Sequence, residues 1–278
     1  KGYAEACKLI KNYKPDVVFS KGGFVSVPVV LAAKRYHVPT IIHESDMTPG
    51  LANKICIPSA AKVCCNFPET LQYLPKDKAV LTGSPIRREL LTGDRLSGLQ
   101  YTHLSADKPI ILVIGGSLGS VTVNQAVRSI LPQLLTNFQV IQICRKGHLD
   151  ESLIGTPGYV QYEYVNAPLR HLFAAADLII SRAGANSICE ILALRKPNIL
   201  IPLSAAASRG DQILNASSFA KQGFSTLLEE EQLTEHSLFQ AITDTYQKRA
   251  DFIHTMEQSH LSNAVDTIIS LIEECASK

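Results

Sequence analysis

The sequence has no apolar run of the length that a bilayer-spanning helix needs, which is about 20 residues. It also has no concentration of positive charge: the formal net charge is +2, and Lys and Arg are spread along the chain. A dedicated nucleic-acid-binding protein would gather these side chains on one surface. The two absences argue against an integral membrane protein and against a nucleic-acid partner.

The sequence also lacks C-x-x-C motifs. The chain has 7 cysteines, an odd number, and no C-x-x-C spacing. This predicts neither a disulfide framework nor a zinc site. Most of the cysteines lie in apolar strand or helix patterns, where a free thiol behaves as a small hydrophobic group. A reducing cytosol fits this usage, and no signal-peptide pattern is visible.

The glycine loops do not follow the best-known nucleotide motifs. The apolar strand expected at 110–114 is followed by GGSLGS and then by a helix over about 123–135. This loop is neither a Walker A loop nor G-x-G-x-x-G, which argues against a nicotinamide-dependent oxidoreductase. A glycine loop that opens a helix is still a candidate phosphate cradle, because backbone N–H groups converge there.

Strands alternate with helices along the 278 residues, a length typical of about two domains. This alternation predicts parallel sheets covered by helices on both faces, with ligands at the carboxyl ends of the strands. A composition that is 46% hydrophobic supplies a sizeable core. The expected strands are 17–20, 40–43, 62–66, 80–83, 110–114, 140–144, 159–165, 178–180, 198–201 and 225–228.

The segment 178–190, LIISRAGANSICE, is the centre of the site prediction. A short strand ends at a glycine turn, and Asn186-Ser187 is expected to open a helix whose free N–H groups suit a diphosphate. Glu190, one turn further on, is placed to accept hydrogen bonds from ribose hydroxyls. Ser187 and Glu190 also have the spacing of a capping box, which closes a helix end without any ligand. Both interpretations stay open here.

Ser84-Pro85 predicts another helix start, since serine is a good N-cap and proline a good first residue. Arg87 would then lie in the first turn, where it either meets a ligand anion or is a solvated surface arginine. The polar residues 92–108 are expected to be a linker region. The predicted domains are therefore 1–91 and 92–258, with a C-terminal helix in 259–278 that packs back on the first domain.

Asp211-Gln212 starts another predicted helix. Asp211 suits that position because a carboxylate stabilises a helix N-terminus. Gln212 has no such structural reason to be there, and its amide could bind the hydroxyls of a sugar.

Six stretches in chain order resemble motifs of the MurG family, the N-acetylglucosaminyl transferases of bacterial peptidoglycan synthesis. They are KPDVVFSKGGFVSVP, HESDMTPGLANK, LTGSPIR, LVIGGSLGS, SRAGANSICE and GDQILNA. The resemblance implies a GT-B fold, in which two Rossmann-like domains face a cleft. It implies inverting transfer of N-acetylglucosamine from UDP-N-acetylglucosamine to lipid I, undecaprenyl-diphospho-muramyl-pentapeptide, which forms lipid II. It implies no cofactor and no metal.

The resemblance also implies roles for single residues. His43 and Glu44 match the acceptor-side loop and are the candidates for the catalytic base, and Asp46 stands where many members have Asn. The implied donor-side positions are Arg87, Ser117, Val165, Ala185, Asn186, Ser187, Ile188, Cys189, Glu190, Asp211 and Gln212. The implied location is peripheral, on the cytoplasmic face of the cell membrane, with other cell-wall synthesis proteins as candidate partners.

One family motif is not found: the glycine-rich G-G-T-G-G-H loop with which members open. The chain is therefore expected to be an N-terminally truncated member. Two alternatives remain at this point. One is a UDP-sugar-binding fragment that lacks turnover or depends on a partner chain. The other is a different GT-B enzyme that uses UDP-N-acetylglucosamine, such as a 2-epimerase or a glycolipid transferase.

Overall fold

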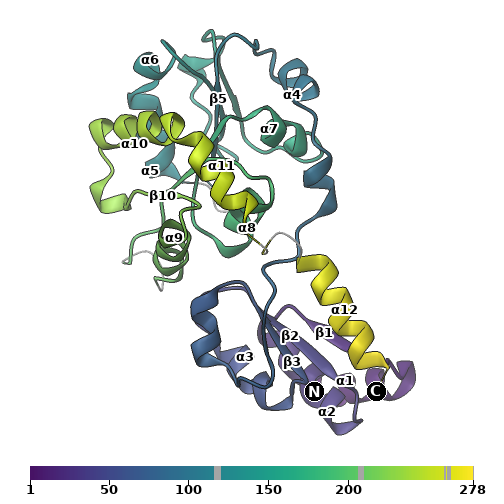
Figure 1. Ribbon diagram of the computed structural model, residues 1–278. Helices are drawn as coiled ribbons and strands as arrows, with labels where there is room; N and C mark the ends of the chain where they lie inside the picture. The colour runs from purple at the N-terminus through teal and green to yellow at the C-terminus, as the bar shows by residue number, and fades with distance from the viewer. Residues whose placement is uncertain (116–119, 206–209, 260, 262–263, 278) are drawn as a thin grey trace. The chain divides into compact units, whose positions relative to one another are not determined.

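The structure is a computed structural model that describes residues 1–115, 120–205, 210–259, 261 and 264–277. The chain forms two compact units (Figure 1). The first unit comprises Lys1–Pro85 and His260–Lys278, and the second comprises Ile86–Ser259. The final segment therefore belongs to the same unit as the first 85 residues.

The first unit is built on a four-stranded sheet in the order β1-β2-β3-β4, and all its pairings are parallel. Its strands are β1 Val18–Ser20, β2 Thr40–Glu44, β3 Lys62–Cys65 and β4 Ala79–Leu81. Its helices are α1 Gly2–Tyr13, α2 Val27–Arg35, α3 Leu51–Cys56 and α12 Ala264–Ala276. Short 3-10 helices lie at η1 Phe24–Ser26, η2 Ile57–Ser59 and η3 Pro68–Tyr73.

Both faces of this sheet are buried: all five residues of β2 and the last three residues of β3 are buried. Successive side chains point to opposite faces. Ile42 packs with Val63 in a cluster that includes residues of α2 and α3. Ile41 and Cys64 point the other way and pack against Ile268 of α12. The C-terminal helix is thus the cover of one sheet face.

The second unit is built on a six-stranded parallel sheet in the order β10-β9-β8-β5-β6-β7. Its strands are β5 Ile110–Ile114, β6 Gln139–Ile143, β7 Tyr159–Tyr162, β8 Leu178–Ser181, β9 Asn198–Leu200 and β10 Thr226–Leu227. Its helices are α4 Arg95–Thr102, α5 Val121–Ser129, α6 Leu131–Leu134, α7 Leu169–Ala175, α8 Ala185–Ala193, α9 Asp211–Lys221, α10 Glu235–Gln247 and α11 Arg249–Glu257. Its 3-10 helices are η4 Arg88–Thr92, η5 Glu151–Leu153 and η6 Glu230–Gln232.

The alternation along β5 divides the core of this unit into two layers. Ile111 and Val113 point into a cluster with residues of α5, α6 and α10. Ile110 and Leu112 point into a cluster with residues of η4, α4, α7 and α8. The sheet is therefore covered on both faces, and the fold class predicted from the strand–helix alternation is confirmed.

Two predicted features of the segment between the sheets are wrong. Ser84-Pro85 does not open an α-helix: residues 82–87 have no regular secondary structure, and a 3-10 helix begins only at Arg88. The expected linker at 92–108 contains α4, which is capped by the Asp94 carboxylate on the Ser97 N–H. The side of α4 that carries Leu99 is buried.

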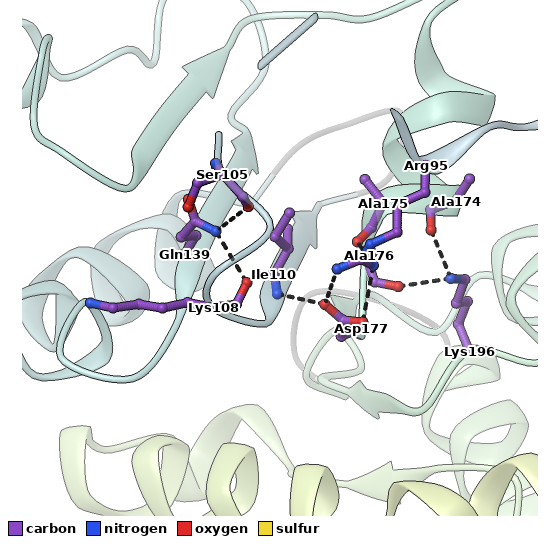
Figure 2. Close-up of polar contacts among 10 residues, drawn as sticks. All are labelled: Arg95, Ser105, Lys108, Ile110, Gln139, Ala174, Ala175, Ala176, Asp177 and Lys196. Carbon is purple, nitrogen blue, oxygen red and sulfur yellow. Dashed lines mark hydrogen bonds and ion pairs between the residues drawn. The ribbon is translucent and has the colours of Figure 1, made fainter. Parts of the chain in front are cut away.

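Polar contacts fix α4 to the start of the sheet (Figure 2). Arg95 donates two hydrogen bonds, each 3.1 Å long, to the two carboxylate oxygens of Asp177 and a third to the Ala175 carbonyl oxygen. Asp177 in turn accepts the Ile110 N–H at 2.8 Å. Lys196 donates to carbonyl oxygens at the end of α7. These bonds join α4, the end of α7, the first residue of β5 and Lys196 at one end of the unit.

Among the described residues no helix has the length and apolarity that crossing a membrane requires. All seven cysteines are free thiols.

Candidate functional site

A cavity of about 740 Å³ lies within the second unit, at the carboxyl ends of its central strands. This volume is in the range of pockets that bind small molecules. Its apolar lining comes from residues at or just beyond the ends of β5, β6 and β7, together with residues of η4 and α7: Ile114, Ile143, Val165, Leu90 and Leu169. Charged and polar side chains surround this lining, among them Arg87, Arg145, Lys146, Glu163, Ser187 and Glu190.

Helix α8 supplies one wall of the cavity through Ser187 and Glu190. Gly184 is the N-cap of α8, and the first bond within the helix runs from the Ile188 N–H to its carbonyl oxygen. The preceding three N–H groups, from Ala185 to Ser187, consequently have no partner within the helix. Because Gly184 leaves open space where a side chain would be, an anion can approach these groups closely.

The predicted capping box at Ser187 and Glu190 is wrong. Ser187 is the third residue of α8 rather than its N-cap. Its side chain and that of Glu190 both line the cavity. Since helix capping does not occupy Glu190, its carboxylate is available for other partners.

Glu190 forms an ion pair with Arg87, with 3.2 Å between Oε1 and Nη2. Burial raises the pKa of the Glu190 carboxyl, and the neighbouring Arg87 charge partly offsets that rise. Arg87 comes from the segment directly before η4, and its side chain is 60% exposed. The pair therefore joins two segments that are 103 positions apart in sequence.

Arg182, the residue directly after β8, is buried and holds several loops at the same edge of the sheet. It donates to the Ser120 hydroxyl at 2.7 Å and to the carbonyl oxygens of Ile201 and Pro202. It also forms an ion pair with Glu230. The sequence analysis assigned it no role, although a charged residue at the end of an apolar strand is a usable signal.

The other residues predicted to contact the sugar-nucleotide donor lie on α8 and α9. Ile188 and Cys189 are buried, so only their backbone can meet a ligand. Asp211 and Gln212 are the first two residues of α9. The side-chain oxygen of Gln212 accepts the Leu203 N–H at 3.1 Å. Ser117 lies outside the described residues.

His43, at the end of β2 in the first unit, is fully buried with both ring nitrogens engaged. Nε2 lies 2.9 Å from the Gly83 carbonyl oxygen, and Nδ1 lies 3.0 Å from Nζ of Lys21. Burial, and then the Lys21 charge, lower the pKa of His43 to about 4. The neutral ring therefore donates from Nε2 to the carbonyl oxygen and accepts from the lysine at Nδ1.

Glu44 organises the loop that follows β2. Its carboxylate accepts the N–H groups of Asp46 and Gly50 and the amide of Asn53, at 3.1, 3.0 and 2.8 Å. The carboxylate is buried. The loop is tied down further by Asn66, which donates to the Ser45 carbonyl oxygen. Of the predicted acceptor-side residues, His43 and Glu44 therefore end β2, and Asp46 lies in the loop that follows it.

Within the second unit, the cavity brings together four residues that were predicted separately, namely Arg87, Val165, Ser187 and Glu190. The sequence analysis missed the basic residues Arg145 and Lys146 after β6. It also missed Lys21, whose signal is a cation directly after a short apolar strand. Among the described residues there is no group of three or more His, Cys, Asp or Glu that could hold a metal ion.

Comparison with known proteins gives matches over most of the chain. The glycosyltransferase family 28 C-terminal domain matches residues 110–271, and the N-terminal domain of the same family matches residues 1–65. A relative from Lachnoclostridium phytofermentans is 63% identical over 274 residues, which cover 99% of this chain and 77% of the relative. A relative from Lachnospira eligens is 60% identical, with coverage of 98% and 77%. Both are named UDP-N-acetylglucosamine–N-acetylmuramyl-(pentapeptide) pyrophosphoryl-undecaprenol N-acetylglucosamine transferase.

Solved structures agree in fold. The crystal structure of MurG from Acinetobacter baumannii has a TM-score of 0.78 at 26% identity and covers 98% of this chain and 77% of its own. A UDP-GlcNAc 2-epimerase from Neisseria meningitidis has a TM-score of 0.70 at 13% identity, with coverage of 98% and 80%. That second likeness shows only the shared two-sheet architecture of GT-B enzymes. On the sequence matches, this chain is a MurG homologue and belongs to glycosyltransferase family 28.

Proposed function

We propose that the cavity of the second unit holds the uridine diphosphate part of UDP-N-acetylglucosamine. The protein is an N-acetylglucosaminyl transferase: it moves N-acetylglucosamine from this donor to lipid I and so forms lipid II in peptidoglycan synthesis. The observation that carries the donor-site proposal is the convergence of Arg87, Val165, Ser187 and Glu190 on one cavity.

The cavity suits each part of a uridine diphosphate. Its apolar floor, with Ile114 and Val165, accepts the faces of a uracil ring. The carboxylate of Glu190 is a strong acceptor for the two ribose hydroxyls. The N–H groups at the start of α8 face the diphosphate, because a helix N-terminus favours negative charge.

These groups also assist departure of the UDP leaving group. Negative charge grows on its diphosphate as the bond to the sugar breaks, and preorganised N–H groups and the Arg87 guanidinium stabilise that charge. The family resemblance also implies inversion at the anomeric carbon, and we include this inversion in the proposal. Ala185 and Asn186 complete the proposed diphosphate side, and the same role for Ser117 rests on the family resemblance alone.

The sugar is assigned to the start of α9. Since the Leu203 N–H occupies the side-chain oxygen of Gln212, the amide is oriented with its NH₂ group as the available donor. A sugar hydroxyl accepts that bond, with Asp211 beside it as an acceptor. Ile188 and Cys189 contribute through their backbone.

For His43 and Glu44 we propose positioning roles in place of the expected proton transfer. His43 is neutral and holds Lys21, and Glu44 shapes the loop that carries Asp46. Lipid I is the acceptor assigned to this side. An acceptor with a lipid tail requires peripheral contact with the cytoplasmic membrane surface, where other cell-wall synthesis proteins are the expected neighbours.

The donor-site proposal is tested by replacing Glu190 with Ala and titrating UDP-N-acetylglucosamine by calorimetry. Loss of hydrogen bonds to a charged acceptor costs about 1.5–3 kcal/mol, so binding should weaken by about tenfold or more. The matched control is Glu257→Ala, an acid of the same unit that pairs with Arg195 on the surface. Equal affinity in wild type and Glu190→Ala would refute the assignment.

A further inference from the structure

The group assigned to the ribose already has a partner in the structure. Glu190 is paired with Arg87 through one carboxylate oxygen at 3.2 Å. Arg87 is also the cation assigned to the diphosphate. Nη2 of Arg87 donates to the carboxylate, so a ligand phosphate that needs the same nitrogen competes with Glu190 for it.

The side chains of Arg87 and Glu190 differ in how far they are exposed to solvent. The Glu190 side chain is 19% exposed and lies on a helix, whereas the Arg87 side chain is 60% exposed and comes from a segment without regular secondary structure. An exposed ion pair of this kind is weak and is easily exchanged for another anion. The arginine is therefore the partner that moves, and the carboxylate is the one that stays.

We propose that Arg87 covers the ribose-binding carboxylate of Glu190 until a ligand phosphate draws it away, so that the pocket selects phosphorylated uridine ligands over uridine. A ligand that carries phosphate supplies Arg87 with a new partner and frees Glu190 in the same step. Uridine supplies no such partner and must compete with Arg87 for the carboxylate. The inference rests on the donor-site proposal and adds a source of specificity to it.

The test compares two ligands, UDP and uridine, in wild type and in Arg87→Gln, with dissociation constants taken from NMR titrations. UDP should bind about tenfold or more weakly to the variant, because a charge-assisted contact is lost. Uridine should bind about two- to fivefold more tightly, which corresponds to release of an exposed ion pair. Arg87→Gln should therefore weaken UDP binding and strengthen uridine binding. These opposite changes in affinity distinguish exchange of the Arg87 partner from a simple phosphate contact.

The matched control is Arg195→Gln, which removes an arginine from another exposed ion pair of the same unit, with Glu257. Neither ligand should bind it differently from wild type. If uridine binds to Arg87→Gln no more tightly than it binds to the wild-type protein, the proposed exchange of Arg87 between Glu190 and a phosphate is refuted. Arg87 would then be only a phosphate contact. If wild type binds neither UDP nor uridine, the donor-site proposal itself fails.

A second measurement needs no variant. Salt screens exposed ion pairs. Uridine carries no charge, so added salt should strengthen its binding to the wild-type protein by loosening the Arg87–Glu190 pair, while UDP binding weakens. Uridine affinity that falls or stays constant with rising salt would contradict the proposal.

Discussion

His43 shows how the surroundings of a candidate catalytic base determine its protonation state. The ring lies between a carbonyl oxygen and a lysine ammonium. Burial and the lysine charge favour its neutral form and lower its pKa, and the hydrogen bond to the Gly83 carbonyl oxygen only partly offsets them. Its pKa is lowered to about 4, which leaves it uncharged over the whole physiological range. A neutral imidazole is the form that can accept the Lys21 hydrogen bond.

This arrangement makes a prediction for the titration of His43. In ¹⁵N NMR spectra of the imidazole, its signals should not shift between pH 8 and about 5.5, because the ordinary histidine pKa is about 6.5 and this one is far lower. Lys21→Met should raise the pKa, since the lysine charge lowers it, while burial keeps it below the ordinary value. Titration of His43 near pH 6.5 in the wild-type protein would show that the ring is not held as described.

The same pKa links pH to stability. The unfolded chain takes up a proton on this histidine near pH 6.5, while the folded chain does so only near pH 4. Between these values the unfolded state binds more protons, so the free energy of unfolding falls as the pH falls, by at most about 3 kcal/mol. Urea unfolding at pH 7 and at pH 4.5 should show this loss in wild type and much less of it in His43→Gln. Equal losses in both proteins would assign the pH dependence to other groups.

At the scale of single residues, the sequence could indicate which side chains are candidates for the site, but it could not predict which of them contact one another. Glu190, which lines the cavity, could be singled out because it follows a strand–glycine–helix motif by one turn. Its pairing with Arg87 across 103 positions could not be inferred, because it depends on how η4 packs beside the sheet. Likewise, nothing local in the sequence reveals that Lys21 would meet His43.

Packing of α4 on α7 is the element-scale feature that the sequence analysis missed. Gly98 lies in this contact, and a Cβ atom there would clash with the His171 carbonyl oxygen and the side chain of Ala175. Figure 1 shows the two helices side by side in the second unit. The close approach therefore depends on the missing side chain rather than on an unusual backbone angle.

Gly98→Ala should destabilise the second unit even though alanine is the better helix former. The gain in helix propensity is at most about 1 kcal/mol. Forcing the two helices apart costs typically about 1–3 kcal/mol, and disturbing the Arg95–Asp177 contacts adds to that cost. The comparison is with Gln100→Ala, at an exposed position of the same helix, by thermal unfolding. A melting temperature for Gly98→Ala at or above that of wild type would contradict this account.

Elements with strong local patterns were predictable, and those that depend on tertiary contacts were not. Strands such as β5 are unbroken apolar runs, and their burial on both faces explains the pattern. Ser84-Pro85 carries good helix-start residues, yet residues 82–87 have no regular secondary structure. α4 was taken for a linker because its own periodicity is weak, and it is held by the Arg95 contacts in Figure 2.

At the scale of the whole molecule, the first unit is discontinuous in sequence. α12 covers one face of the four-stranded sheet through Ile268 and Cys275, which pack with Ile41 and Cys64. The residues that link β4 to α12 along the chain form the complete second unit. The stability of the first unit therefore depends on a helix that is distant in sequence.

Ile268→Ala should destabilise the first unit by about 2–4 kcal/mol, as expected for truncation of a buried side chain. Hydrogen exchange followed by mass spectrometry reports each unit separately. Peptides from β2 and β3 should lose protection, while those from β5 and β8 keep it. Ile269→Ala, at an exposed neighbouring position, is the control and should leave both sets unchanged. Loss of protection confined to the second unit would contradict the role assigned to α12.

The position of α12 has a consequence for synthesis on the ribosome. Domains generally fold in the order in which the nascent chain delivers them. Here the residues of the second unit, 86–259, emerge before α12, so that unit can fold while the sheet of the first still has one apolar face uncovered. The sheet of the first unit, which precedes the second unit in the chain, is thus completed after it.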